Sequence, residues 1–179
     1  MAEDQAPEAA REEAARGRMT RLREAAVRVD SHPVVLGAVE LLRAVGDAVE
    51  DTFFAAGGTI VKRLGDGVMA VFDDPQAALG AALDAQTALE GVAVEGHRPR
   101  MRVGVHHGCP RKVGGDYLGV DVNIAARVAE QAGAGEVLVS EPTWEHFDHD
   151  GLAAGRAKRL KADGAPREMR VRTVSRARD

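Results

Sequence analysis

A Gly-Asp-Gly turn separates two short apolar runs in residues 61–72, which read VKRLGDGVMAVF. Glycine suits a tight hairpin turn because it adopts positive φ angles without steric cost. Aspartate is also a common turn residue, so Asp66 taken alone is most simply interpreted as part of the hairpin. A carboxylate in such a turn is equally the kind of oxygen ligand that Mg2+ prefers. The local sequence leaves both roles open for Asp66.

Polar residues further along the chain have spacings that could serve a charged ligand. Asn123 and Arg127 are four residues apart in DVNIAARVAEQ, so they project from one face if this segment is a helix. A guanidinium there could stabilise charge on a phosphate, although such a pair is common by itself. His106 and His107 could suggest a metal site, but a zinc site needs further ligands nearby. We therefore interpret the two histidines as residues at the end of a strand.

The spacing of the apolar residues predicts the elements that position these side chains. A weak helical pattern covers residues 19–29, and a stronger amphipathic helix covers residues 34–55. Strands and helices then alternate before a closing antiparallel pair, which predicts an α+β, mixed α/β sandwich. The remaining predictions are strands at 59–64, 68–72, 101–108 and 136–140, helices at 75–89, 121–134 and 141–147, a turn-rich loop at 111–119 and a final hairpin within 157–174.

The composition indicates one domain with an aliphatic core. The chain has 179 residues, 3% aromatic residues and a net charge of −4, which argues against nucleic acid as a partner. Residues 1–18 form a charged extension rich in Ala, Glu and Arg, so we place the domain at 19–179. A single cysteine, Cys109, fits a reducing compartment. The sequence contains no run that predicts a membrane span or a signal peptide, so we expect a cytoplasmic protein without a membrane partner.

Three segments resemble, in order, motifs of the catalytic domain of class III nucleotidyl cyclases, the adenylate and guanylate cyclases. GGTIVKRLGDGVMAVF (residues 57–72) resembles the GG-x-x-x-K-x-x-GD-x-x-M-A-x-F hairpin of that family. RMRVGVHHG (residues 100–108) resembles its R-x-G-x-H-x-G strand, and DYLGVDVNIAARV (residues 116–128) resembles its D-Y-x-G-x-x-V-N-x-A-A-R signature. The resemblance extends from about residue 34 to residue 174. It implies a ferredoxin-like βαββαβ core.

The resemblance implies conversion of ATP to cyclic AMP and pyrophosphate at a dimer interface, for signal transduction. Asp66 matches one of two aspartates that hold Mg2+ or Mn2+ in the family. Lys62 matches a residue that donates to the adenine ring, and Asp116 matches one that accepts from the adenine amino group. Guanine-selective members carry other residues at these two positions, so the pair points to ATP rather than GTP.

The resemblance also implies roles for three further residues. Asn123 matches the family's asparagine that orients the ribose, and Arg127 matches the arginine that stabilises charge developing at the phosphate. Lys161 matches a lysine that grips the terminal phosphates. In this family, the metal aspartates come from one subunit, and the other subunit supplies the residues that match Lys62, Asp116, Asn123 and Arg127.

The chain departs from the family pattern upstream of the hairpin. The first metal aspartate of the family lies in an F-x-D-x-x-G-F-T strand, and no such motif occurs here. The usual spacing from Asp66 leads back to residues 19–26, where Glu24 is the sole acid. Asp30 is too near Asp66 in sequence, and it precedes a His-Pro break instead of a Gly-Phe-Thr turn. We therefore expect the N-terminal strand to be lost or remodelled, one metal site at most to form, and activity to be impaired in the chain alone.

Three functions remain open at this stage. The chain is an adenylate cyclase, as a homodimer or as a heterodimer with a complete cyclase domain. Alternatively, it is a weak or silent regulatory module of cyclase fold that binds nucleotide or dimerises. The least favoured reading is a ferredoxin-like domain whose motif matches are accidental. Production of cyclic AMP by the purified chain separates the first function from the others.

Overall fold

The computed structural model describes residues 23–30, 37–64, 67–93, 96 and 98–177. Within them, one mixed sheet has the strand order β2-β3-β1-β4-β7-β10-β8, and β9 also pairs with β10. The β4–β7 pair is parallel, and the other pairs of this sheet are antiparallel. The strands are β1 (Arg23–Asp30), β2 (Thr59–Leu64), β3 (Gly67–Phe72), β4 (Arg100–His107), β7 (Val137–Ser140), β8 (Leu152–Ala154), β9 (Lys158–Arg159) and β10 (Arg170–Arg176).

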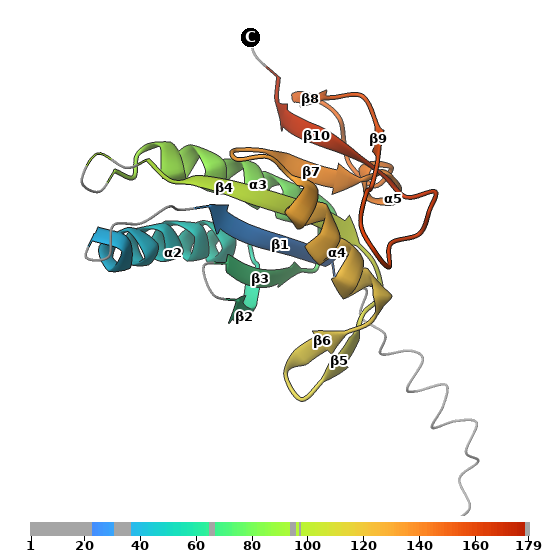
Figure 1. The fold of residues 1–179 in the computed structure, drawn as a ribbon, viewed down its shortest axis with the longest axis horizontal. Coiled ribbons are helices and arrows are strands. Elements are labelled where there is room, and N and C mark those ends of the chain that lie inside the picture. Colours follow the sequence, from blue (N-terminus) through green and yellow to red (C-terminus); the bar gives the residue numbers. More distant parts are fainter. Residues whose placement is uncertain (1–22, 31–36, 65–66, 94–95, 97, 178–179) are drawn as a thin grey trace, which may run out of the picture.

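Helices cover both faces of this sheet (Figure 1). Helices α2 (Gly37–Ala55) and α3 (Pro75–Glu90) lie on one face, and α4 (Val120–Gln131) lies on the other. The short helix α5 (Glu141–Trp144) follows β7 directly. The strands β5 (Arg111–Val113) and β6 (Asp116–Leu118) form a separate hairpin that projects from the sheet. Among the described residues, no helix has the length and apolar character needed to span a membrane.

The two faces of the sheet bury separate aliphatic clusters. The larger cluster packs α2 and α3 against the sheet, with Phe53 and Phe72 in edge-to-face contact at 5.5 Å between ring centroids. Helix α3 starts as its sequence predicts, because the Asp74 carboxylate accepts from the backbone N–H groups of Gln76 and Ala77. The smaller cluster lies under α4 and includes Ile124, Val128, Leu138, Leu160 and Val171.

Helix α4 lies unusually close to strand β4. A Cβ atom added at Gly104 would lie 2.2 Å from the backbone nitrogen of Ala129, well inside van der Waals contact. A larger residue at position 104 would therefore push the helix away from the sheet. Gly104 therefore sets the distance between β4 and α4, the helix that carries Asn123 and Arg127.

The prediction of a helix at residues 19–29 is wrong for residues 23–29. Residues 23–30 form β1, a central strand that pairs with β3 on one side and β4 on the other. Alanine and charged residues favour helix locally, but hydrogen bonds along both edges of the strand outweigh that preference. The N-terminal strand is therefore remodelled in sequence and is not lost. Residues 1–22, including the predicted extension at 1–18, lie outside the described residues.

The other element predictions agree with the structure, apart from two segments. The ferredoxin-like core is confirmed as β1-α2-β2-β3-α3-β4, and the closing hairpin is confirmed as β9 with β10. Residues 111–119 contain the β5–β6 hairpin where a loop was predicted. Strand β8 was not predicted, because its short segment LAA carries no alternating pattern.

Candidate functional site

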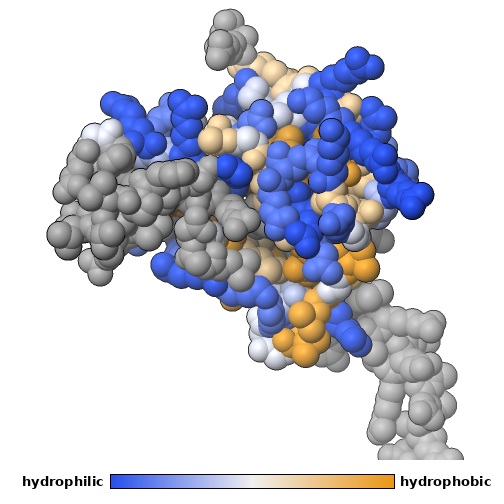
Figure 2. Space-filling model, in the orientation of Figure 1, coloured by the Kyte–Doolittle hydropathy of each residue, from blue (hydrophilic) through white to orange (hydrophobic). Residues whose placement is uncertain are grey.

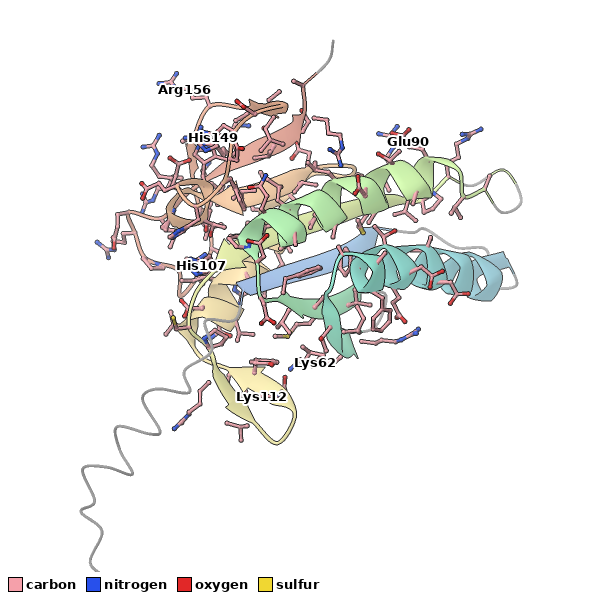
Figure 3. All side chains as sticks on the ribbon, turned by 180° about the vertical axis from the view of Figure 1, so that it is seen from behind. Lys62, Glu90, His107, Lys112, His149 and Arg156 are labelled. Atoms are coloured by element: carbon pink, nitrogen blue, oxygen red, sulfur yellow. The ribbon has the colours of Figure 1, made fainter. Side chains whose placement is uncertain are left out.

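An ion pair joins Lys62 on β2 to Asp116 at the start of β6. The Lys62 Nζ atom lies 2.9 Å from Oδ1 and 2.7 Å from Oδ2 of Asp116, so the ammonium binds both carboxylate oxygens. The Lys62 and Asp116 side chains remain 36% and 41% exposed. In Figure 3, Lys62 lies beside the hairpin that carries Lys112. The structure thus brings together two predicted site residues that are 54 positions apart in sequence.

The surroundings of Asp116 keep its carboxylate ionised. The hydrogen bond from Lys62 holds the pKa of Asp116 below its usual range, and the backbone N–H of Tyr117 adds to this effect. That N–H donates to Oδ1 of Asp116 over 2.7 Å. Tyr117 is itself buried against Met69 and Val71 of β3, which anchors this end of the hairpin to the sheet. The pair therefore presents one cationic donor and one anionic acceptor at a partly exposed surface.

Asn123 and Arg127 lie one turn apart on the exposed side of α4, as their spacing predicts. The opposite side of the helix buries Ile124 and Val128. The Arg127 Nη1 atom donates to Glu130 Oε2 over 2.6 Å. This hydrogen bond, assisted by the charge of Glu130, raises the pKa of Arg127.

Arg127 shares a cavity of about 490 Å³ with Lys161. Gln131, at the end of α4, links this helix to the segment that carries Lys161. Its side-chain oxygen accepts from the Lys161 backbone N–H over 2.6 Å, and its Nε2 donates to the Arg159 carbonyl over 3.2 Å. Two cations around one opening could bind the oxygens of a polyphosphate. The full lining is Arg127, Glu130, Gln131, Lys161, Ala162 and Asp163.

Asp66, the predicted metal ligand, lies outside the described residues. The described residues on either side of it show which end of the strands it follows. Leu64 of β2 pairs with Gly67 of β3, and residues 65–66 connect these two strands. Strand β1 runs antiparallel to β3, with Val27 opposite Val68. The C-terminal end of β1 therefore lies at the same edge of the sheet as the Gly-Asp-Gly connection.

The strand register identifies Asp30 as an acid that the sequence argument rejected. Asp30 is the last residue of β1 and pairs with Arg100, at the edge of the sheet where residues 65–66 connect β2 and β3. Glu24 pairs with Val71 and so lies toward the opposite edge. The rejection of Asp30 relied on its short sequence distance from Asp66 and on the His-Pro break that follows it, but six residues suffice to connect β1 with α2. The alternating VRVD run that ends at Asp30 was the signal that could have revealed a strand ending there.

The chemistry of these acids fits a magnesium ion. Among the described residues, no group of three or more His, Cys, Asp and Glu side chains could hold a metal. Mg2+, however, is commonly bound by one or two carboxylates together with substrate phosphates and water. One acid from the end of β1 and one from the adjacent connection match that requirement.

The described fold agrees with comparisons to known proteins. The family model "Adenylate and Guanylate cyclase catalytic domain" matches residues 36–172. An uncharacterized protein of Mycobacterium tuberculosis strain H37Rv is 32% identical over 119 residues, which cover 63% of this chain and 31% of the relative. The pH-sensitive adenylate cyclase MT1302 of M. tuberculosis strain CDC 1551 is 38% identical over 85 residues, covering 48% of this chain and 21% of that protein. The chain thus spans less than a third of the length of these relatives.

Solved structures extend the similarity over most of the chain. An adenylate/guanylate cyclase/hydrolase from Silicibacter pomeroyi is 30% identical, with a TM-score of 0.67, and the match covers 87% of this chain and 96% of that one. The adenylyl cyclase CyaB from P. aeruginosa has a TM-score of 0.72 at 21% identity, covering 88% and 95% of the two chains. At that lower identity, the likeness to CyaB speaks for the fold alone.

Proposed function

The chain belongs to the adenylate and guanylate cyclase catalytic-domain family, and on that premise we propose that it binds ATP and converts it to cyclic AMP and pyrophosphate. The observation that carries this proposal is the Lys62–Asp116 pair, in which a donor and an acceptor lie side by side at a partly exposed surface. Adenine offers a ring-nitrogen acceptor next to an amino donor, which matches this pair. Guanine offers the reverse order on that edge, which would leave both side chains poorly matched.

The proposed roles of α4 and Lys161 concern the sugar and the phosphates. Asn123 orients the ribose so that its 3′-oxygen faces the α-phosphorus. Arg127 stabilises the negative charge that develops on the α-phosphate, and Lys161 holds the terminal phosphates. The 3′-hydroxyl gives its proton to water and its oxygen bonds to the α-phosphorus. The bond from that phosphorus to the bridging oxygen breaks, and pyrophosphate leaves with the electron pair of that bond.

Asp66 and Asp30 are the residues that we propose to hold Mg2+ or Mn2+. When bound, the metal neutralises the phosphates and favours the deprotonated 3′-oxygen. Asp30 supplies the second carboxylate that the sequence argument considered missing. We propose that the chain alone turns over slowly, because residues 33–35 after Asp30 read Pro-Val-Val where the family pattern has its Gly-Phe-Thr turn.

We also propose that the active unit is a dimer, either of this chain or with a complete cyclase domain. Three large apolar side chains stand exposed around the β5–β6 hairpin, namely Val113 at 47%, Leu118 at 51% and Val120 at 64%. Figure 2 shows hydrophobic surface on this projecting hairpin. Burying these side chains against a second cyclase domain would remove apolar surface from water.

A cyclase-fold module with little turnover is the second candidate function. The observation in its favour is that the charges around the phosphate cavity cancel, because Glu130 and Asp163 stand beside Arg127 and Lys161. Two carboxylates would oppose a triphosphate unless metal ions accompany it. Such a module would bind nucleotide weakly and act through dimerisation.

An assay for cyclic AMP tests the proposed function. The purified chain is incubated with ATP, or with GTP, and Mg2+ or Mn2+, alongside Asp66→Ala and Asn123→Ala. We expect cyclic AMP from ATP, and we expect both variants to lose it, while the control Asp150→Ala, in an exposed turn, keeps it. A folded chain that makes no cyclic AMP, alone or mixed with a complete cyclase domain, would favour the silent module.

A further inference from the structure

Buried polar side chains from three elements meet at the end of β4. His106 is 4% exposed, and Ser140 and Thr143 are fully buried. The His106 Nδ1 atom lies 2.7 Å from Ser140 Oγ, which lies 2.6 Å from Thr143 Oγ1. On the other side of the imidazole, His106 Nε2 lies 3.4 Å from Asp121 Oδ1, in the first turn of α4. These contacts form one continuous chain from α5 through β7 and β4 to α4.

The chemistry at the Asp121 end of this chain determines where the protons lie. A carboxylate can only accept, so the His106 Nε2 atom must carry a proton toward Asp121. Burial lowers the pKa of His106, although the hydrogen bond and charge of Asp121 oppose this effect, so the imidazole is neutral near pH 7. Nδ1 then accepts from the Ser140 hydroxyl, and Ser140 Oγ accepts from Thr143. The backbone N–H of His107 donates to Thr143 Oγ1 over 2.7 Å. Every hydrogen bond from His107 N–H to the His106 imidazole therefore donates in the same direction along the chain.

The chain of hydrogen bonds holds the first turn of α4 against the end of β4. The second carboxylate oxygen of Asp121 accepts from the Cys109 backbone N–H over 2.8 Å. Gly108 leaves no space between the strand end and this carboxylate, because an added Cβ would lie 2.2 Å from Asp121 Cγ. Gly119, which precedes the helix, provides no side-chain cap. Asp121 is thus directed to β4, and not to the N–H groups of its own helix.

We propose that His106 is a positioning residue that fixes the N-terminal end of α4 and thereby the direction of Asn123 and Arg127. Asn123 is two residues after Asp121 on the same helix, and Arg127 is one turn further. A small rotation at the first turn would displace both side chains from the ribose and the phosphate. Because Gly104 and the cluster under α4 hold the middle of the helix, loss of the His106 link changes its orientation without unfolding it. The catalytic part of this inference rests on the proposed cyclase function.

Two variants of His106 separate the donor at Nε2 from the acceptor at Nδ1. His106→Gln keeps an N–H donor near the Nε2 position, and His106→Asn can reach Ser140 but not Asp121. We expect His106→Asn to lower kcat about tenfold with little change in KM, and His106→Gln to stay within about threefold of the wild type. His149→Gln, an exposed histidine after α5, is the matched control and is expected to have no effect.

Spectroscopic measurements test the positioning independently of turnover. Imidazole 15N shifts of the wild-type chain should show His106 protonated at Nε2 and not at Nδ1 at neutral pH. Amide exchange in the first turn of α4 should become faster in His106→Asn and not in His106→Gln. If His106→Asn does not fold, Asp121→Asn tests the same link from its more exposed end, with the same expected rise in exchange.

The outcomes distinguish this inference from the proposed function. A proton on Nδ1, or unchanged exchange in a folded His106→Asn chain, overturns the positioning role even if the wild type makes cyclic AMP. A wild-type chain that makes no cyclic AMP overturns the proposed function, and the tautomer and the exchange rates then still decide whether His106 fixes α4.

Discussion

The Lys62–Asp116 and Arg127–Glu130 ion pairs differ in what brings their partners together. Lys62 and Asp116 come from β2 and β6, 54 residues apart, and a backbone N–H from the anchored Tyr117 also holds Asp116. Arg127 and Glu130 are three residues apart on the exposed side of one helix. Spacing of three or four residues produces such pairs on many helices, and their contribution to stability is small. A pair formed by the tertiary fold is therefore the stronger indication of a built site.

The same difference separates the two ends of the proposed nucleotide site. The base end is assembled before any ligand binds, because its donor and acceptor already face each other. At the phosphate end, Arg127 points to a local partner, and Lys161 is placed beside it through Gln131. We infer that base selection relies on a preformed pair, whereas the phosphate contacts rearrange when the ligand binds.

Substitution of Asp30, the proposed metal ligand that only the strand register identifies, should have the largest effect on turnover. We expect Asp30→Asn to lower kcat by a factor on the order of a thousand and to weaken Mn2+ dependence, because a metal ligand loses its charge. Glu24→Gln, on the same strand but toward its other end, is the matched control and should stay within about threefold of the wild type. Cyclic AMP production measured across a Mn2+ titration distinguishes the two. Equal losses in both variants would contradict the placement of the metal site.

Arg127→Ala should have the next largest effect. We expect kcat to fall about a hundredfold with a much smaller change in KM, because the guanidinium acts on charge that develops in the transition state. Arg167→Ala, an exposed arginine in the neighbouring loop, provides the control. Steady-state kinetics with ATP measure both parameters. A rise in KM with unchanged kcat would instead make Arg127 a ground-state phosphate ligand.

Substitutions in the Lys62–Asp116 pair should affect base choice more than turnover. We expect Lys62→Ala and Asp116→Ala each to raise KM for ATP about tenfold and to reduce the preference for ATP over GTP. The double variant should lose less transition-state binding free energy, measured from kcat/KM, than the two single variants together, because the partners act as a unit. The ratio of kcat/KM for the two nucleotides is the measurement. Additive losses would mean that the ion pair is not the recognition unit.

Glu130→Gln should give the smallest effect of the series. Removing this carboxylate frees Arg127 and lowers the negative charge at the phosphate cavity, so ATP should bind about twofold more tightly at low salt. Glu145→Gln, at an exposed acid directly after α5, should leave ATP binding unchanged. Nucleotide titration at two salt concentrations measures the effect. A weaker affinity after Glu130→Gln would show that this acid helps to orient Arg127.

The sequence predicted most of the fold because its apolar spacing is strong where the core is large. The segments that became β2, β3, α3, β4 and α4 have clear periods and turn residues at their ends. Strand β1 was missed because Arg, Glu and Ala dominate it, and its position between β3 and β4 arises from the tertiary structure. Because this strand was missed, the sequence was interpreted as lacking one metal carboxylate, the role for which we propose Asp30.

The site residues that belong to sequence motifs could be predicted. The residues that come together only through contacts between separate elements could not. The ordered motifs identified Lys62 and Asp116 as site residues, and the structure adds the contact between them. No sequence pattern could show that Asp121 faces His106 or that His106 reaches Ser140, because these contacts join separate elements. The same holds for Asp30, whose place beside the β2–β3 connection follows from strand register.

Complementation between two inactive variants tests the central claim, a cyclase site shared by two subunits, most directly. Asp66→Ala removes a proposed metal ligand, and Asn123→Ala removes a proposed nucleotide contact, so each homodimer should be inactive. If metal ligands and nucleotide contacts come from different subunits, a mixed dimer regains one complete site. With random pairing, an equal mixture should recover about a quarter of wild-type cyclic AMP production. No recovery from mixed dimers that demonstrably form, with an active wild type, would contradict a site built across the two subunits.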